Sequence, residues 1–299
     1  MWQAPKHLKK GDTIGIVSTA RKISLEELSV AIHVFEGWGL NVKIGKTIGA
    51  EFHQFAGEDK LRATDFNEML SDNSVKAIIC ARGGYGTARV IEQIDFSYLK
   101  RNPKWICGFS DVTVLHNALH NVGIQSIHSV MPVQAPTTAP SSLESLRKAL
   151  FGEPLNYEWN HHSLNKIGKA ESVIVGGNLS IIYSLGGTKY DISTKEKILF
   201  FEDLDEYLYH IDRMMYNLKL SDKLTQLKAL VVGGMNDMND NKIPFGFDAE
   251  VIISLACKEY NFPISFGFPA GHISENNAII FGSKVQLEVN SENSKLRFI

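Results

Sequence analysis

Hydrophobic and polar positions follow two alternating periods through the first half of the chain. Short apolar runs rich in β-branched residues occupy residues 13–19, 41–46, 75–81, 104–110 and 126–130. Between them, residues 24–40, 58–70, 84–94 and 111–119 carry apolar side chains at helical spacing. This alternation predicts βαβ units that build a parallel sheet of five strands. A further helical pattern follows at residues 141–152.

The pattern changes after this helix. Residues 152–171 are polar, rich in Asn and His, and have no helical period, so we place a linker at residues 153–170. Apolar runs then predict strands at residues 171–177, 197–203, 227–234, 263–267, 278–282 and 284–289, with helices between them. The last two runs are close enough to pair as an antiparallel hairpin. The sequence therefore predicts an α/β protein with a parallel-sheet domain at 1–152 and a mixed α/β domain at 171–299.

Composition narrows the possible partners. The 299 residues carry a formal net charge of -2, which gives no basic field for nucleic acid or anionic membranes. No apolar stretch approaches the roughly 20 residues that a membrane-spanning helix requires. The N-terminal residues lack the features of a secretory signal, and the three cysteines lie in apolar segments. We expect a cytoplasmic protein with reduced thiols.

Ser110 stands where the apolar run at 104–110 meets a helical pattern. A serine at a strand-to-helix turn can expose its hydroxyl at the carboxyl end of a sheet, near helix N–H groups that stabilise an oxyanion. No second glycine follows as in G-x-S-x-G, and serine also caps helices without any catalytic role. Nucleophile and helix cap both remain open on this evidence.

A glycine-rich turn, RGGYG at residues 82–86, follows the predicted strand at 75–81. Its spacing is not G-x-G-x-x-G and no P-loop lysine follows, so a nucleotide loop is weakly indicated. Glycines also occur in turns simply because tight turns need positive φ. A third interpretation is that a backbone N–H of this loop completes an oxyanion hole with the N–H after Ser110, since neighbouring strand ends meet at one sheet edge.

Glu202 and His272 are the candidates for the remaining catalytic groups. Glu202 directly follows the apolar residues of a predicted strand, where a carboxylate can orient a histidine, although acidic residues also favour helix starts. His272 lies in a loop of the second domain after Gly271. A loop position could let it face a serine of the first domain.

Two patterns resemble metal sites. His116 and His120 have the i, i+4 spacing of a zinc pair, but Asn117 replaces the glutamate of H-E-x-x-H. Residues 237–248 begin like a calcium loop, but Lys242 stands where glycine is required. We therefore expect no metal.

Several longer motifs together resemble the LD-carboxypeptidase family of murein peptidases, which is related to microcin-immunity peptidases. They are RGGYG (82–86), GFSDVT (108–113), GGNLSIIYSLGGT (176–188), FFEDLDEYLYHIDRM (200–214) and GFPAGH (267–272), in that order. The resemblance covers nearly the whole chain. It implies a flavodoxin-like or amidotransferase-like N-terminal domain that carries the nucleophile, and a C-terminal domain that supplies glutamate and histidine.

The resemblance also implies roles for residues. Ser110 would be the nucleophile, His272 its general base and Glu202 the carboxylate that holds the imidazole, with no cofactor. The backbone amides of Gly84 and Asp111 would form the oxyanion hole. The substrate implied is a murein tetrapeptide, cut between an L-centred diamino acid and terminal D-alanine, by an enzyme that is often a homodimer. The candidates for recognition of the substrate's charged groups are Arg82, Arg89 and Asn178.

Two alternatives remain. A relative in the same family would hydrolyse acyl-nucleotide antibiotics, with Trp159 or a tyrosine of residues 207–209 stacking on the base. A non-catalytic binding module would hold a ligand at RGGYG and would not need Ser110.

Overall fold

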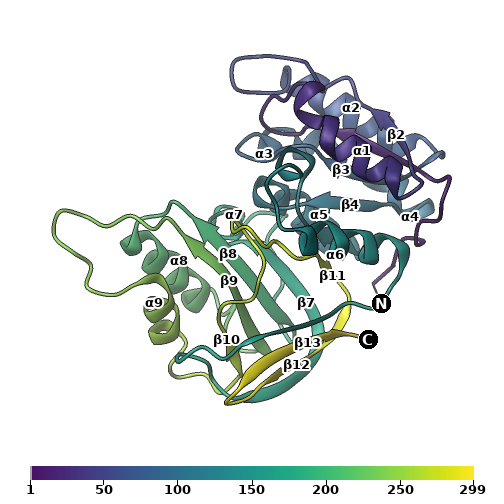
Figure 1. The fold of residues 1–299 in the computed structure, drawn as a ribbon. Helices are drawn as coiled ribbons and strands as arrows, with labels where there is room; N and C mark the ends of the chain where they lie inside the picture. The colour runs from purple at the N-terminus through teal and green to yellow at the C-terminus, as the bar shows by residue number, and fades with distance from the viewer. Residues whose placement is uncertain (1) are drawn as a thin grey trace. The chain divides into compact units, whose positions relative to one another are not determined.

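The computed structural model describes residues 2–299, which form two compact units (Figure 1). The first unit comprises residues up to 154 together with 276–282, and the second comprises 155–275 and 283–299. The apolar core of the first unit consists of fully buried sheet and helix side chains, among them Ile16, Phe66, Ile79 and Ile106. Each unit is described separately below.

The first unit is built on a six-stranded sheet in the order β11-β5-β4-β3-β1-β2. Its parallel strands are β1 (Thr13–Val17), β2 (Asn41–Ile44), β3 (Val75–Cys80), β4 (Trp105–Gly108) and β5 (Ser126–His128), as the sequence predicts. The order 2-1-3-4-5 is that of flavodoxin-like doubly wound folds. β3 and β4 are buried along most of their length because central parallel strands are covered on both faces.

Helices connect these strands. They are α1 (Ser29–Gly37), α2 (Asp59–Ser71), α3 (Thr87–Val90), α4 (Ser97–Arg101), α5 (Thr113–Val122) and α6 (Pro140–Phe151). Short 3-10 turns precede or follow them: η1 (Glu26–Leu28), η2 (Ile91–Gln93), η3 (Ser110–Val112) and η4 (Pro132–Gln134). The sequence marks the ends of α6 well, since it starts at Pro140 and stops at Gly152 in the left-handed conformation.

The second unit contains a seven-stranded mixed sheet in the order β10-β9-β8-β7-β12-β13-β6. Parallel pairing joins β7 (Gly168–Asn178), β8 (Ile198–Leu204), β9 (Ala229–Asn236) and β10 (Ile264–Ser265). Antiparallel pairing joins β12 (Lys284–Val289), β13 (Asn293–Phe298) and β6 (Asn156–Asn160) to the other side of β7. Its helices are α7 (Leu179–Ser184), α8 (Leu208–Leu220) and α9 (Ala249–Ala256). The stretch proposed as a linker thus contributes β6 to this sheet.

The predicted hairpin between residues 278–282 and 284–289 is wrong. β11 (Ile279–Phe281) pairs antiparallel with β5 in the first unit, whereas β12 pairs with β7 and β13 in the second. Two apolar runs separated by a glycine and a serine fit a hairpin locally, but each run buries its side chains in a different core. The chain therefore changes unit between the two strands.

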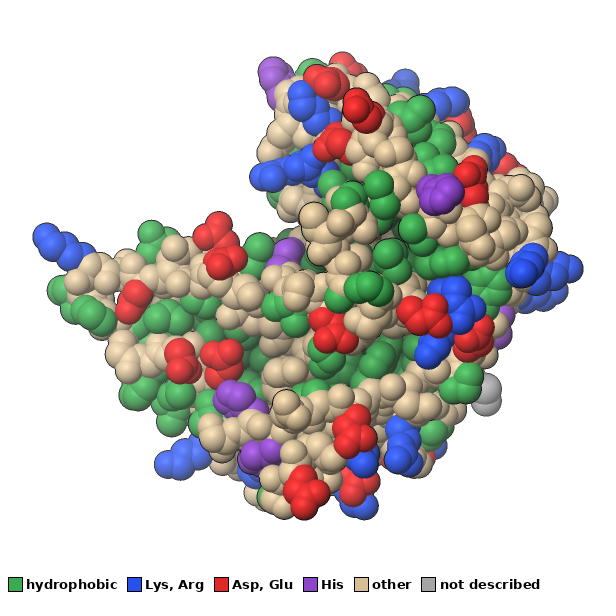
Figure 2. Space-filling model, viewed as in Figure 1, with side chains coloured by type: hydrophobic (Ala, Val, Ile, Leu, Met, Phe, Trp, Pro, Cys, Tyr) green, Lys and Arg blue, Asp and Glu red, His purple; other side chains and the backbone are tan. Residues whose placement is uncertain are grey.

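The surface charges and the length and apolar character of the helices agree with the overall composition. Acidic and basic side chains are interspersed on the face of the molecule in Figure 2, with no large field of one sign. No helix within residues 2–299 combines the length and the apolar character needed to cross a membrane. The three cysteines, Cys80, Cys107 and Cys257, are buried free thiols.

Candidate active site

Ser110 occupies a sharp turn between β4 and α5. Its φ is 60°, in the left-handed region that costs a non-glycine residue about 1 kcal/mol or more. Neither η3 nor α5 receives a hydrogen bond from a capping side chain, so within the described residues Ser110 does not act as a conventional helix cap. The strained strand-to-helix turn is the conformation by which hydrolases present a nucleophilic serine.

The glycine-rich loop after β3 lies directly against this turn. A Cβ atom built on Gly83 would be 3.1 Å from Ser110 Cβ and 3.2 Å from Ser110 Oγ. Gly84 has a φ of 106°, and a Cβ there would meet the Arg21 side chain at 2.6 Å. Only glycine therefore fits at position 84, and the backbone of this loop approaches Ser110 closely, as the pairing of β3 with β4 requires.

Buried charged side chains hold the loop in place. The Asp111 carboxylate accepts a hydrogen bond from the Thr87 backbone N–H at 2.8 Å, and burial raises the pKa of Asp111. The fully buried Arg62 donates to the carbonyl oxygens of Thr19 and Gly86, the latter at 2.9 Å, and pairs with Asp59. These contacts fix the carboxyl-terminal end of the stretch from Gly83 to Thr87. No sequence signal distinguishes Arg62, which stands in an ordinary polar helix pattern.

Glu202 and His272 lie together in the second unit. Glu202 is fully buried in β8, and its Oε2 accepts a hydrogen bond from His272 Nδ1 at 2.6 Å and another from the His272 backbone N–H at 3.1 Å. Burial of His272 favours the neutral ring, but the charge and hydrogen bond of Glu202 outweigh burial and raise the pKa of His272. The imidazole is thus fixed in one orientation by a carboxylate that is inaccessible to solvent.

The loop before His272 can reach Glu202 only because position 271 is glycine. Gly271 has a φ of 113°, and a Cβ there would lie 2.7 Å from both Cβ and Oε2 of Glu202. Gly267, earlier in the same loop, also has a positive φ of 74°, but a Cβ there would meet nothing within 4 Å. The close approach is therefore specific to the residue that precedes the histidine.

Asn178 and Asp203 extend the network around Glu202. Asn178 Nδ2 donates to Asp203 Oδ1 at 2.8 Å and lies 3.4 Å from Glu202 Oε1. Asp203 also accepts from the backbone N–H groups of Ser180 and Leu204. Burial, followed by the charge of Glu202, raises the pKa of Asp203 to about 7. Asn178, which the sequence offered for substrate binding, is 3% exposed and is directed at these two carboxylates.

The other candidate residues occupy different places. Arg82 lies at the start of the glycine-rich loop, and its Nη1 donates to the Lys22 carbonyl oxygen at 3.3 Å. Arg89 forms an ion pair with Asp59 at 2.8 Å. Trp159, which we considered for base stacking, is buried, and its Nε1–H donates to the Phe266 carbonyl oxygen at 3.0 Å.

The two metal-like patterns have structural partners. His116 is buried, with its ring nitrogens 2.8 Å from Ser126 Oγ and 2.9 Å from the Gly108 carbonyl oxygen. Burial lowers the pKa of His116 to about 3, so its ring is neutral. Asp240 accepts hydrogen bonds from the backbone N–H groups of Asn241 and Phe245. Across residues 2–299 no group of three or more His, Cys, Asp or Glu side chains is arranged to hold a metal ion.

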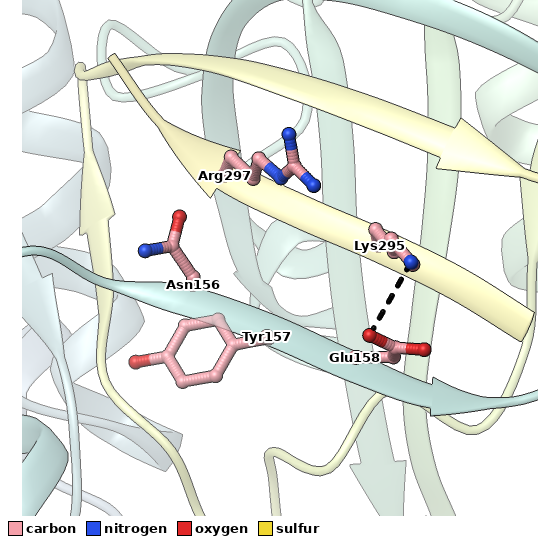
Figure 3. A pocket seen from close by; sticks show the side chains of 5 residues that line it. All are labelled: Asn156, Tyr157, Glu158, Lys295 and Arg297. Carbon is pink, nitrogen blue, oxygen red and sulfur yellow. Dashed lines mark ion pairs between the residues drawn. The ribbon is translucent and has the colours of Figure 1, made fainter.

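A shallow hollow of about 460 Å³ lies elsewhere, on the edge of the second sheet (Figure 3). Asn156, Tyr157 and Glu158 line it from β6, and Lys295 and Arg297 line it from β13. Lys295 and Glu158 pair across it at 3.4 Å. It contains none of the candidate catalytic residues.

Comparison with known proteins places the chain in a family. Residues 14–129 match the model of the LD-carboxypeptidase N-terminal domain, and residues 171–287 match that of the LD-carboxypeptidase C-terminal domain. A probable murein peptide carboxypeptidase of Bacillus subtilis is 36% identical, over 95% of this chain and 91% of that protein.

Solved structures agree with these matches. The crystal structure of a muramoyltetrapeptide carboxypeptidase from Oxalobacter formigenes has a TM-score of 0.86 at 26% identity, covering 96% of this chain and 98% of that one. The microcin C7 self immunity protein has a TM-score of 0.86 at 21% identity, covering 99% and 98% of the two chains, and shares the fold. The family models match both halves of the sequence, and the solved structures match the fold over nearly its full length. The chain therefore belongs to the LD-carboxypeptidase family.

Proposed function

We propose that this chain is a serine LD-carboxypeptidase that removes the terminal D-alanine from murein tetrapeptides, with Ser110, Glu202 and His272 as its catalytic triad. The observation that carries the proposal is the pairing of His272 Nδ1 with the buried Glu202 carboxylate at 2.6 Å. A carboxylate can only accept this bond, so Nδ1 carries the proton and Nε2 is the basic nitrogen. The strained turn at Ser110 supports its role as the nucleophile.

The reaction follows from these groups. Nε2 of His272 would remove the proton of Ser110 Oγ as the oxygen attacks the scissile carbonyl carbon. The backbone N–H groups of Gly84 and Asp111 would stabilise the oxyanion. His272 would then protonate the nitrogen of the departing D-alanine, which leaves an ester between the tripeptide and Ser110. Water, deprotonated by the same histidine, would cleave that ester and restore Ser110.

The substrate assignment is supported by the relatives. The B. subtilis relative is named for a murein peptide, and the O. formigenes structure for a muramoyltetrapeptide. We propose that Arg82 contributes to binding the substrate, and that Asn178 does so either directly or by fixing Glu202. Arg82 is half-buried and lies 3.7 Å from Glu27, whereas the Asn178 amide contacts Asp203 and Glu202.

We also propose a cytoplasmic homodimer. Three buried free thiols are typical of a reducing compartment, which supports the location. Light scattering of the purified protein would test the dimer, since a mass of one chain in solution would contradict it.

Hydrolysis of acyl-nucleotide antibiotics has less support. The likeness to the microcin C7 self immunity protein is one of fold. The indole of Trp159 packs edge-on against Phe268 with ring centroids 5.0 Å apart, so it is not presented for stacking on a base. Tyr207 and Tyr209 are the more exposed aromatic residues for this alternative.

The proposal is tested by mass spectrometry of murein tetrapeptide incubated with the protein in the presence of a chelator. We expect the wild type to release one D-alanine and Ser110→Ala to release none. Ser71→Ala is the matched control, because Ser71 is an exposed serine at the end of α2 whose hydroxyl donates to the Glu68 carbonyl oxygen. Equal cleavage by Ser110→Ala would remove Ser110 from the mechanism. Cleavage of an acyl-sulfamoyl nucleotide but not of tetrapeptide by the wild type would favour the alternative.

A further inference from the structure

A small cavity opens in the first unit beside the glycine-rich loop. Its volume is about 290 Å³, at the lower limit for small-molecule sites, so it suits a ligand the size of an amino acid better than a nucleotide. Lys22 and Glu27 line it after β1, Glu51 lines it after β2, and Arg82 lines it after β3. Ile23 and Ala50 contribute apolar wall.

The cavity lies at the point where the sheet topology favours ligand binding. In the order β2-β1-β3, the chain first moves from β1 to one neighbour and then crosses back to the other. The loops that leave β1 and β3 therefore diverge at the carboxyl ends of these strands and form a crevice between them. Doubly wound sheets bind their ligands at this switch point.

The charges in the cavity balance. Lys22 Nζ pairs with Glu51 Oε2 at 2.7 Å, and Arg82 Nη1 lies 3.7 Å from Glu27 Oε1. Two cations thus face two carboxylates. A ligand with a single charge would displace one partner of an ion pair and leave the charge of that partner uncompensated. A ligand with both charges would bind one cation and one carboxylate, so the two displaced groups would also carry opposite charges.

Arg82 has unused capacity to bind a ligand. A guanidinium has five N–H donors in a planar fork that fits a carboxylate. Within the described residues, Arg82 makes one hydrogen bond, to the Lys22 carbonyl oxygen at 3.3 Å, and the long ion pair to Glu27. Glu27 is itself held by the Ser24 backbone N–H at 2.8 Å. Both ion pairs of the cavity are partly exposed and therefore weak enough to be exchanged.

We propose that this cavity binds a zwitterionic amino-acid group, with its carboxylate on Arg82 and its ammonium on Glu51. Gly83, the residue after Arg82, lies against Ser110, so a single loop both lines the cavity and contacts the proposed nucleophile. The inference deepens the proposed function: if the chain cleaves peptides, the free amino and carboxyl groups of a diamino acid side chain would occupy this cavity.

The test is a titration of the full-length protein with three charge-matched ligands, followed by backbone amide shifts in ¹⁵N NMR spectra. L-alanine carries both charges, N-acetyl-L-alanine only the carboxylate and L-alaninamide only the ammonium. We expect L-alanine to shift the amides of Ser24 and Gly49, which line the cavity, and to bind about 10-fold or more tightly than either half ligand, because each half ligand lacks one of the two charge-assisted hydrogen bonds.

Variants separate this cavity from any other site. Arg82→Gln and Glu51→Gln should each weaken L-alanine binding by about 10-fold or more on the same grounds. Lys46→Gln is the matched control, because Lys46 is an exposed cation of the same loop as Glu51 but pairs with Glu68 outside the cavity. Equal binding of all three ligands, or unchanged affinity in Arg82→Gln and Glu51→Gln, would overturn the inference. The titration needs no catalysis, so its outcome is independent of whether tetrapeptide is cleaved.

Discussion

The buried Glu202 carboxylate accepts two hydrogen bonds from the same residue, His272, one from the ring and one from the backbone. The hydrogen bond from the backbone N–H fixes the position of His272 in its loop, and the hydrogen bond from Nδ1 fixes the orientation of the imidazole. The carboxylate therefore determines both where the histidine is and which of its nitrogens carries a proton.

Glu202→Gln should reduce kcat by about three to four orders of magnitude, by analogy with removal of the orienting carboxylate from a serine protease triad. The amide has nearly the same shape, but its NH2 group would favour the wrong imidazole tautomer. Glu206→Gln is the control, since Glu206 pairs with His210 on the partly exposed start of α8. Steady-state hydrolysis of tetrapeptide measures the effect, and a loss below about 10-fold would contradict an orienting role for Glu202.

The pH dependence of kcat/KM should reflect the raised pKa of His272. The general base must be neutral, so kcat/KM should increase with pH, and the midpoint should lie above about 6.5, the ordinary value for histidine. In Glu202→Gln the stabilising charge is absent, and the midpoint of the residual activity should move to lower pH. A midpoint that is the same in both proteins would show that another group is titrating.

Gly271→Ala should damage the site more than Gly267→Ala does. Both positions have positive φ, so both variants lose about 1 kcal/mol through backbone strain. At position 271 the new methyl group would also displace Glu202, and kcat should fall strongly. Urea unfolding and tetrapeptide hydrolysis of the two variants measure the difference. Equal activities would mean that the loop adapts without moving Glu202 or His272.

Arg62→Met should destabilise the protein by about 3 kcal/mol, because it leaves buried carbonyl oxygens of Thr19 and Gly86 without their donor. Arg147→Met should cost less than about 1 kcal/mol, although Arg147 pairs with both Glu144 and Glu153, because those pairs are exposed to solvent. Urea unfolding measures both. Arg62→Lys should recover part of the stability, and a loss no larger than that of Arg147→Met would contradict the structural role of Arg62.

Asp203 should make the free energy of unfolding decrease with pH. Its folded pKa of about 7 lies above the value of an unfolded aspartate, so the folded state holds the proton more strongly. The resulting stabilisation is complete below about pH 4 and is lost as pH rises toward about 7. Asp203→Asn lacks this titration, so its stability relative to wild type should improve between pH 4.5 and pH 7.5. A constant difference between the two proteins would contradict the raised pKa.

The sequence predicts where the loops with the candidate catalytic residues lie, because each loop is attached to a regular strand. Ser110 and Glu202 both follow long apolar runs, and the strand order brings RGGYG beside Ser110. In contrast, β13 was missed, because only Ser294 and Leu296 of its residues face a buried side and the apolar pattern is weak. The structural role of Arg62 could not be predicted either, since its guanidinium donates to carbonyl oxygens of residues that are distant in the sequence.

The pairing of β11 with β5 limits how the chain can be divided into separately expressed fragments. Asn276 and Ala278 donate backbone hydrogen bonds to Ser142 and Ser145, and the strand that follows covers the edge of β5. A fragment ending near residue 154 would lack this strand and expose β5 as an unprotected edge, prone to pair with other chains. The first unit is therefore complete only after residues 276–282 have been translated, more than 120 residues after residue 154.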